Sequence, residues 1–146
     1  MKDDFQIRED KGRAKFERMY GRYPHEFTKG KYDSYDVSMT AGTVSYNVEI
    51  KDKNEPIEKW EKDGFILEVD KYLNLMREYW KTGSLPIYLN FFNNGDGFSC
   101  NLTEINPVWE WKPCTKTTAA GTYGEEKIMK YVYMIPADNV KKFKYE

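Results

Sequence analysis

Several residue types that often define a fold or a site are scarce in this sequence. It contains two cysteines, Cys100 and Cys114, and one histidine, His25. A structural zinc site uses about four Cys or His ligands, and these three residues do not show the spacing of metal ligands. A zinc-binding fold is therefore excluded. We expect both cysteines to be free thiols, as is usual in a reducing cytosol, with a single disulfide as the alternative.

Long apolar runs, internal repeats and low-complexity tracts are absent as well. No apolar segment approaches the roughly 20 residues that a membrane-spanning helix needs. The first ten residues, MKDDFQIRED, do not form a signal-peptide pattern. We therefore expect a cytoplasmic protein without a membrane partner. A length of 146 residues, of which 40% are hydrophobic, supplies one core, so we expect a single domain over residues 1–146.

The net charge of −1 conceals an uneven distribution along the chain. Residues 8–31 contain eight basic and four acidic residues, whereas residues 32–146 contain fourteen basic and eighteen acidic residues. A local basic surface binds phosphates even when the total charge is near zero. An ordinary solvated helix face with ion pairs is the alternative. The candidates for nucleic-acid contact are Arg13, Lys15, Arg18, Arg22, Lys29 and Lys31.

The spacing of apolar residues in the first third of the chain predicts a helix and a β-hairpin. Aromatic residues and a methionine recur at intervals of three and four and predict a helix over residues 10–22. Residues 35–40 and 43–51 each alternate between apolar and polar side chains. Ala41-Gly42 between them is typical of a tight turn. This is the clearest hairpin pattern in the sequence.

The rest of the chain predicts a crossover helix and further strands. Residues 57–81 show helical spacing, interrupted at Gly64 and ended at Gly83. Their apolar stripe, which includes Met76 and Trp80, is expected in the core. Residues 106–124 show no clear pattern. Strands are predicted over 86–92, 98–105 and 127–135, and a short helix after Pro136. We therefore predict an α/β fold in three layers, with a mixed sheet of about five strands flanked by helices.

The predicted hairpin brings three polar side chains to one face. With Ala41-Gly42 as a two-residue turn, Asp36 pairs with Asn47. Glu49 is then a diagonal neighbour of Asp36, about 7–8 Å away at the backbone. Lys51 follows on the same face, because side chains at i and i+2 point the same way. We expect this face to be exposed to water.

Two carboxylates and an amine at this spacing suit phosphodiester cleavage. The reaction builds negative charge on the phosphate and on the leaving oxygen, and Mg²⁺ or Mn²⁺ held by carboxylates offsets that charge. A neighbouring lysine can hold the attacking water or stabilise the same charge. We therefore predict a site at Asp36, Glu49 and Lys51, with the backbone carbonyl of Ile50 as a further metal ligand.

The motif resembles a known signature. Asp36, followed thirteen residues later by Glu49-Ile50-Lys51, resembles the D…(D/E)xK motif of the PD-(D/E)xK nuclease superfamily, and the intervening hairpin resembles its Holliday junction resolvase branch and small phage nucleases. The resemblance covers about residues 10–92. It implies a restriction-endonuclease-like fold, two acidic metal ligands and a catalytic lysine. It also implies a metal-proximal glutamate on the preceding helix, for which Glu17 is the matching residue. Tyr35 replaces the proline of the signature.

Other residues compete for these roles. The ExK pattern recurs at residues 9–11, 110–112 and 125–127. The 110–112 copy follows Asp96 by fourteen residues, but Asp96 lies in a glycine-rich turn, and prolines flank the later segment. Asp33 is the rival of Asp36, yet in a continuous strand it faces the other side. Lys71 and Glu68 on the crossover helix are lesser candidates for contact with DNA or the metal's water.

The predicted function is Mg²⁺-dependent hydrolysis of DNA by an endonuclease, with a branched or recombination structure as one candidate substrate. Two alternatives belong to other classes. One is a catalytically silent module that binds nucleic acid through the same basic residues. The other is an interaction protein that docks a partner through its aromatic side chains, which make up 16% of the sequence. The resemblance leaves a homodimer open.

Overall fold

The computed structural model describes residues 4–29, 33–105, 108–117 and 123–146. The described residues form three α-helices, nine strands and two short 3₁₀ helices, η1 and η2. In chain order the elements are α1 (Asp4–Tyr20), β1 (His25–Phe27), β2 (Val37–Ala41), β3 (Val44–Asp52), α2 (Ile57–Asp63), β4 (Phe65–Glu68), α3 (Val69–Thr82), β5 (Leu85–Phe91), β6 (Asp96–Asn101), η1 (Leu102–Glu104), β7 (Val108–Thr117), β8 (Tyr123–Ile135), η2 (Ala137–Asn139) and β9 (Lys141–Lys144).

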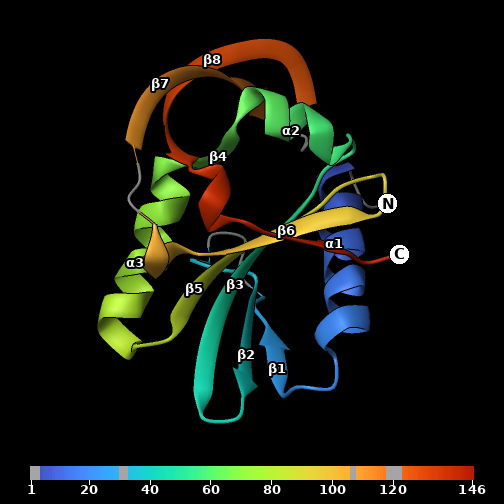
Figure 1. Ribbon diagram of the computed structural model, residues 1–146, viewed down its shortest axis with the longest axis vertical. Helices are drawn as coiled ribbons and strands as arrows, with labels where there is room; N and C mark the ends of the chain where they lie inside the picture. Colours follow the sequence, from blue (N-terminus) through green and yellow to red (C-terminus); the bar gives the residue numbers. More distant parts are fainter. Residues whose placement is uncertain (1–3, 30–32, 106–107, 118–122) are drawn as a thin grey trace.

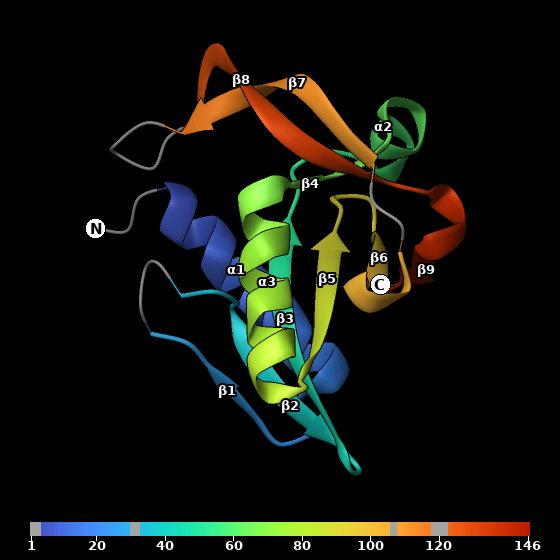
Figure 2. The same cartoon turned by 90° about the vertical axis from the view of Figure 1, so that its left-hand side faces the viewer.

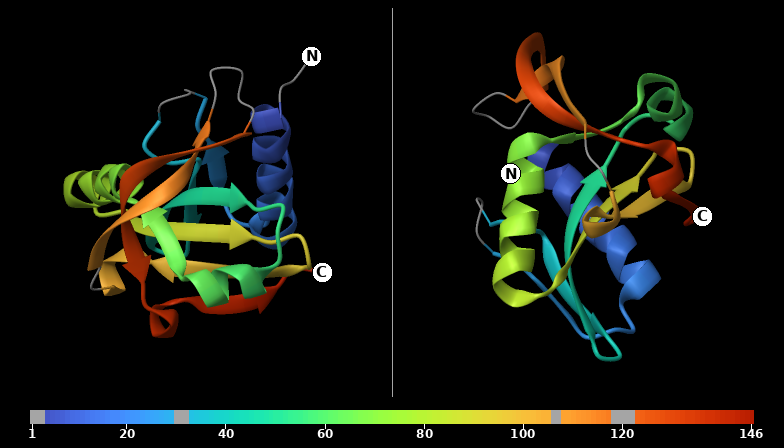
Figure 3. Two further views of the ribbon diagram at one scale, coloured as in Figure 1. Left: turned by 90° about the horizontal axis from the view of Figure 1, so that it is seen from above. Right: turned by 60° about the vertical axis from the view of Figure 1, so that its left-hand side comes forward.

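A six-stranded mixed sheet forms the centre of the molecule, in the order β1-β2-β3-β5-β6-β9. Strands β3 and β5 are parallel, and the other neighbours are antiparallel. Helix α3 belongs to the crossover between β3 and β5 and lies on one face of the sheet, with α1 on the other (Figures 2 and 3). The predicted α/β fold, with helices flanking a mixed sheet, is confirmed.

A second sheet, in the order β4-β8-β7, arches over one end of the molecule (Figure 1). Its edge strand β7 contains Pro113, a residue that edge strands tolerate because proline has no N–H to donate. The ExK copy at residues 110–112 therefore lies in an edge strand of the arch, outside the central sheet. The copy at residues 125–127 lies in β8.

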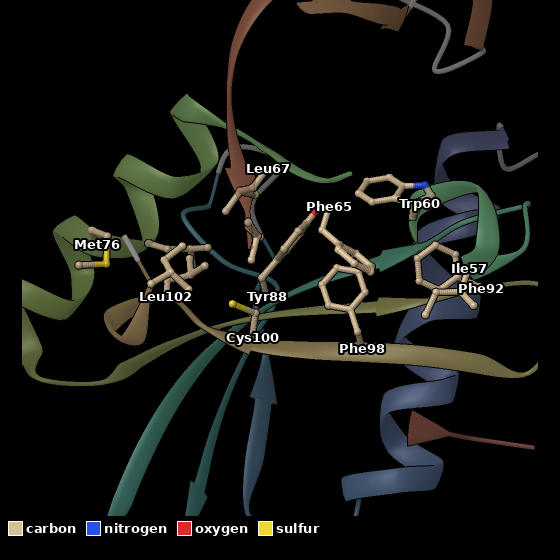
Figure 4. Packing of buried hydrophobic residues seen from close by; sticks show 13 residues of the cluster. Ile57, Trp60, Phe65, Leu67, Met76, Tyr88, Phe92, Phe98, Cys100 and Leu102 are labelled. Atoms are coloured by element: carbon tan, nitrogen blue, oxygen red, sulfur yellow. The ribbon is translucent and has the colours of Figure 1, made fainter. Parts of the chain in front are cut away.

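Two apolar clusters fill the layers on either side of the central sheet. The smaller cluster joins α1 to the sheet and consists of Phe16, Val37, Val48, Leu89 and Phe91. The larger cluster lies beneath α2, α3 and the arch and includes Trp60, Phe65, Tyr88, Phe98 and Leu102 (Figure 4). Cys100 also belongs to the larger cluster as a buried free thiol, as predicted. The side chain of Cys114 lies outside the described part of the chain.

The hairpin forms where the alternation predicts it, but its register differs by two residues. Val37 pairs with Val48 and Ala41 with Val44, so the turn is Gly42-Thr43 instead of Ala41-Gly42. Gly42 has a φ of +63°, which hairpin turns of the primed types require at their first central position. A shift of two residues keeps every side chain on its predicted face.

The polar face of β3 is buried, which corrects the expectation that it faces water. Asn47 and Glu49 are each 4% exposed. They share this face with Tyr88 of β5, which pairs with Glu49 and belongs to the cluster under α3. The crossover helix and β4 pack over a surface that the alternating pattern made appear solvated.

Several elements differ from the sequence prediction. Helix α1 begins at Asp4, and the segment predicted as a helix broken at Gly64 contains the strand β4 between two helices. Strands β1 and β9 were not predicted. Trp80, expected in the core, is 69% exposed. Gly83 ends α3 with a left-handed φ of +80°, as predicted. No helix in the described ranges is long and apolar enough to cross a membrane.

The packing of α1 gives a direct test of the fold. Phe16 is 1% exposed and belongs to the cluster between α1 and the sheet. We expect Phe16→Ala to lower the free energy of unfolding by about 3–5 kcal/mol, because the cavity adds to the lost burial. Trp80→Ala, at an exposed position, should change it by less than about 0.5 kcal/mol. Urea denaturation of both variants measures this, and equal effects would contradict the assigned packing.

Candidate active site

Asp36 is held against the last part of β3 by two hydrogen bonds. Its backbone N–H donates to the Val48 carbonyl at 2.9 Å, and its carboxylate Oδ2 accepts from the Ile50 N–H at 2.7 Å. The residue lies immediately before β2. Val48 and Ile50 are the chain neighbours of Glu49, so these two bonds hold Asp36 beside Glu49, the other carboxyl residue of the predicted site.

Glu49 is a buried carboxylate between two ammonium groups. Its Oε1 lies 3.6 Å from the Lys51 Nζ and 3.5 Å from the Lys71 Nζ. Lys51 is on the same strand, whereas Lys71 comes from the first turn of the crossover helix α3. The Glu49 side chain is 5% exposed, and the two lysine side chains are 33% and 39% exposed. The two lysine side chains thus lie between the buried Glu49 side chain and the solvent.

The surroundings of Glu49 raise its pKa above the usual value of a glutamate. Burial raises the pKa of Glu49, and the negative charge of Asp36 raises it further, while Lys51 and Lys71 act in the opposite direction. A carboxylate that has lost its water and faces a second carboxylate gains most from an additional positive charge. The arrangement is therefore suited to a cation.

A third acid approaches from α1. Burial raises the pKa of Glu9, and the nearby Asp36 adds to the effect, while Arg13 and Lys51 oppose it. Arg13 forms an ion pair with Glu9 at 2.9 Å, one helical turn away. Glu9 therefore lies in the electrostatic neighbourhood of both Asp36 and Lys51. The sequence analysis missed it because the predicted helix began one residue later.

Gly12 allows α1 to come this close. A Cβ atom added at Gly12 would lie 2.9 Å from the Ile50 Cγ2, a distance that side chains do not tolerate. Glycine weakens a helix interior, but here its missing side chain lets the helix pack directly on β3. Glu9 lies three residues before Gly12, on the same side of the helix.

Glu17, the helix glutamate implied by the resemblance, has a different contact. Its Oε1 lies 2.9 Å from the Nε2 of His25. The hydrogen bonds to Glu17 and to the Tyr23 carbonyl raise the pKa of His25. Glu17 follows Glu9 by eight residues, about 12 Å along a helix. Glu9 is therefore a second candidate for the helix acid, beside the predicted Glu17.

Three of the predicted basic residues make contacts within the molecule. Arg13 donates to the Thr28 carbonyl at 3.1 Å in addition to its ion pair with Glu9. Lys15 is bound to Asp52 at 2.6 Å. Arg22 stacks on the Tyr23 ring at 4.5 Å. Arg18 and Lys29 are exposed, and Lys31 lies outside the described residues. Of the rival acids, Asp33 is exposed and Asp96 is bound to Lys144 at 2.6 Å.

The carboxylates present fit a magnesium ion. Within the described ranges, no three His, Cys, Asp or Glu residues gather closely enough to hold a metal alone. Mg²⁺ does not require such a cage, because it usually takes one or two carboxylates and completes its shell with water and substrate phosphate. Asp36 and Glu49 supply two carboxylates. The pKa of Glu49 is raised by burial and, after that, by repulsion from Asp36, and a cation would offset both.

Comparison with known proteins gives one line of similarity. No family model matches this chain, and no curated protein matches it. The crystal structure of Hjc, a Holliday junction resolvase from the archaeal hyperthermophile Archaeoglobus fulgidus, is similar with a TM-score of 0.54. The similarity covers 68% of this chain and 81% of that one at 10% sequence identity. At this identity the likeness establishes the fold, which is restriction-endonuclease-like.

The raised pKa of Glu49 predicts the effect of removing its charge. A carboxyl group whose pKa is higher in the folded state is less favourable when ionised, so ionised Glu49 destabilises the fold at neutral pH. We expect Glu49→Gln to raise the free energy of unfolding of the metal-free protein, because the neutral amide keeps the shape of the side chain without its buried charge. Thermal unfolding in EDTA measures this, with the exposed Glu26→Gln as a matched control. A marked loss of stability would show that the two lysine contacts outweigh burial and repulsion.

Proposed function

We propose that this protein is a metal-dependent nuclease that hydrolyses phosphodiester bonds of DNA at Asp36, Glu49 and Lys51. The observation that carries the proposal is the convergence of two carboxylates on one point of β3, with the Lys51 ammonium 3.6 Å from Glu49. The restriction-endonuclease-like fold supports it. The similar archaeal protein is a Holliday junction resolvase, so four-way DNA junctions are the first substrate to test, beside linear duplexes.

The proposed roles follow from the chemistry of each group. Asp36, Glu49 and the Ile50 carbonyl would hold Mg²⁺ or Mn²⁺, with Glu9 acting through a bound water. The ion supplies positive charge where the phosphate gains negative charge during cleavage. Lys51 orients the attacking water or stabilises the same charge, because its ammonium is both partly exposed and adjacent to Glu49.

Substitution of the three central residues should separate cleavage from binding. We expect Asp36→Asn, Glu49→Gln and Lys51→Met each to lower the cleavage rate by at least about 100-fold. The first two each remove a carboxylate that would hold the metal ion, and the third removes the ammonium proposed to face the reacting phosphate. DNA affinity should change little. Saturating Mg²⁺ or Mn²⁺ should stabilise the parent by about 2.7 kcal/mol at 100 times its dissociation constant, and Asp36→Asn should reduce this gain. Gel-based cleavage, anisotropy and thermal unfolding provide the three measurements.

A DNA-binding module without catalysis is the second candidate, and one observation favours it. The Glu49 Oε1 already has two ammonium partners within 3.6 Å, and these compete with a metal ion for the same oxygen. A parent protein that binds DNA, cleaves no DNA with either metal and shows no metal-dependent stabilisation would establish the module and reject the nuclease.

The two glutamates of α1 provide a matched pair. We expect Glu9→Gln to reduce cleavage by about 10-fold or more, because Glu9 neighbours Asp36 and Lys51. Glu17→Gln should retain activity, because Glu17 pairs with His25 instead. Cleavage rates at several Mg²⁺ concentrations measure the contrast. The reverse result would assign Glu17 as the helix acid and remove Glu9 from the site.

A further inference from the structure

A cavity of about 510 Å³ opens beside the candidate active site. Its walls come from the start of α1, the residues that follow β3, the turn between β5 and β6, and the C-terminal residues. Figure 1 shows these segments gathered on one side of the molecule. The lining side chains used below are Arg8, Lys11, Lys15, Asp52 and Lys53.

The cavity has a positively charged lining. Four of its side chains are basic and two, Asp52 and Glu146, are acidic. The Lys15 ammonium is bound to Asp52 at 2.6 Å and lies over the Tyr145 ring at 4.9 Å, so this pair is neutralised internally. Arg8 and Lys11 lie one turn apart on α1, and Lys53 comes from the segment that follows β3. These three cationic side chains share the lining with one further acid, Glu146.

Lys53 is the most constrained of the three. Its ammonium lies 4.7 Å from the centre of the Trp60 ring. Burial, together with the positive charges of Lys51 and Arg8, lowers the pKa of Lys53 to about 8. A bound anion would relieve this repulsion. Glu55 and Glu68 are the acidic groups that face Lys53, and they offset it only in part.

The position of Lys53 connects this cavity to the reaction. The Lys53 N–H donates to the Phe91 carbonyl at 2.7 Å, which extends the parallel pairing of β3 and β5 beyond Asp52. Lys53 therefore follows Lys51 on the same face, about 6.5 Å along an extended strand. This separation is comparable to one nucleotide step of a DNA strand.

We propose that the cavity lined by Arg8, Lys11 and Lys53 binds a DNA backbone phosphate next to the phosphate that is cleaved. The proposal rests on the function proposed above and adds a second contact on the same strand. The planar Arg8 guanidinium and the two ammonium groups suit phosphate oxygens. Such contacts fix the position of the strand without reading its sequence.

Binding in EDTA tests the cavity without cleavage. The probe is a short fluorescein-labelled DNA duplex, titrated by anisotropy at several salt concentrations. We expect Lys11→Gln and Lys53→Met each to weaken binding several-fold and to reduce the slope of log affinity against log salt by about 0.9, the value of one lost phosphate contact. Lys81→Gln, at the exposed end of α3, is the control and should match the parent.

Two readouts keep the result unambiguous. Thermal unfolding verifies that both variants fold. If Lys53→Met does not fold, Lys11→Gln still tests the cavity, because Lys11 is exposed. The proposal would be overturned if Lys11→Gln, alone or together with Lys53→Met, bound DNA with the same affinity and the same salt slope as the parent. A parent that cleaves DNA while the variants bind normally retains the nuclease and rejects the cavity. If the parent binds DNA through the cavity but never cleaves it, the phosphate contact is retained and the nuclease is rejected.

The same site gives a pH dependence with a defined sign. A bound phosphate raises the pKa of Lys53 above its free value of about 8, so binding requires the protonated form. DNA affinity of the parent should therefore fall as the pH rises through about 8. In Lys53→Met this part of the dependence should disappear, and an unchanged profile would remove Lys53 from the contact.

Discussion

The burial of the Glu49 carboxylate is the constraint on which the candidate site depends. Removing an ionised group from water costs several kcal/mol unless partners replace the water. Here the partners arrive from two elements, Lys51 on the strand and Lys71 on the crossover helix. The crossover must therefore place its first turn over this part of β3. Asp36 then adds repulsion at the same point, which a purely structural ion pair would avoid. The arrangement stabilises the fold less than an apolar core would, and it leaves a place where additional positive charge is favourable.

The approach of α1 adds the second part of the site. Gly12 lowers the stability of the helix, but because it has no side chain the helix packs directly on Ile50. Phe16, one turn further on, anchors the same face in the core. This packing carries Glu9 toward Asp36, and Arg8 and Lys11 toward the residues that follow β3. Helix α1 therefore contributes the acidic Glu9 to the proposed metal site and the basic Arg8 and Lys11 to the neighbouring cavity.

The sequence predicted the hairpin, the parallel crossover and the α/β class, because alternation and helical spacing record which side chains share a face. It could not give the register, since a shift of two residues leaves that alternation unchanged. Only the turn distinguishes the two registers, and the positive φ of Gly42 selects Gly42-Thr43. Alternation also does not reveal which face a later helix covers. The polar face of β3 therefore appeared wet, although α3 and β4 bury it. Strands such as β1 and β9 are too short to show a pattern of their own.

The proposed residues that the sequence pattern did not indicate share a physical reason. Glu9 comes one residue before the predicted start of the helix, and Lys53 follows the end of β3. Their proposed roles depend on contacts between segments far apart in the chain. The alternation of side chains along β3 nevertheless relates Lys53 to Glu49. From Glu49 onward, alternate residues face opposite sides, so Asp52 turns to Lys15 of α1 while Lys51 and Lys53 turn to the face of Glu49. Asp52 also lines the cavity, but it is bound by Lys15. Lys53 and the two basic residues of α1, Arg8 and Lys11, are therefore the cationic groups of this lining that we propose for contact with a phosphate.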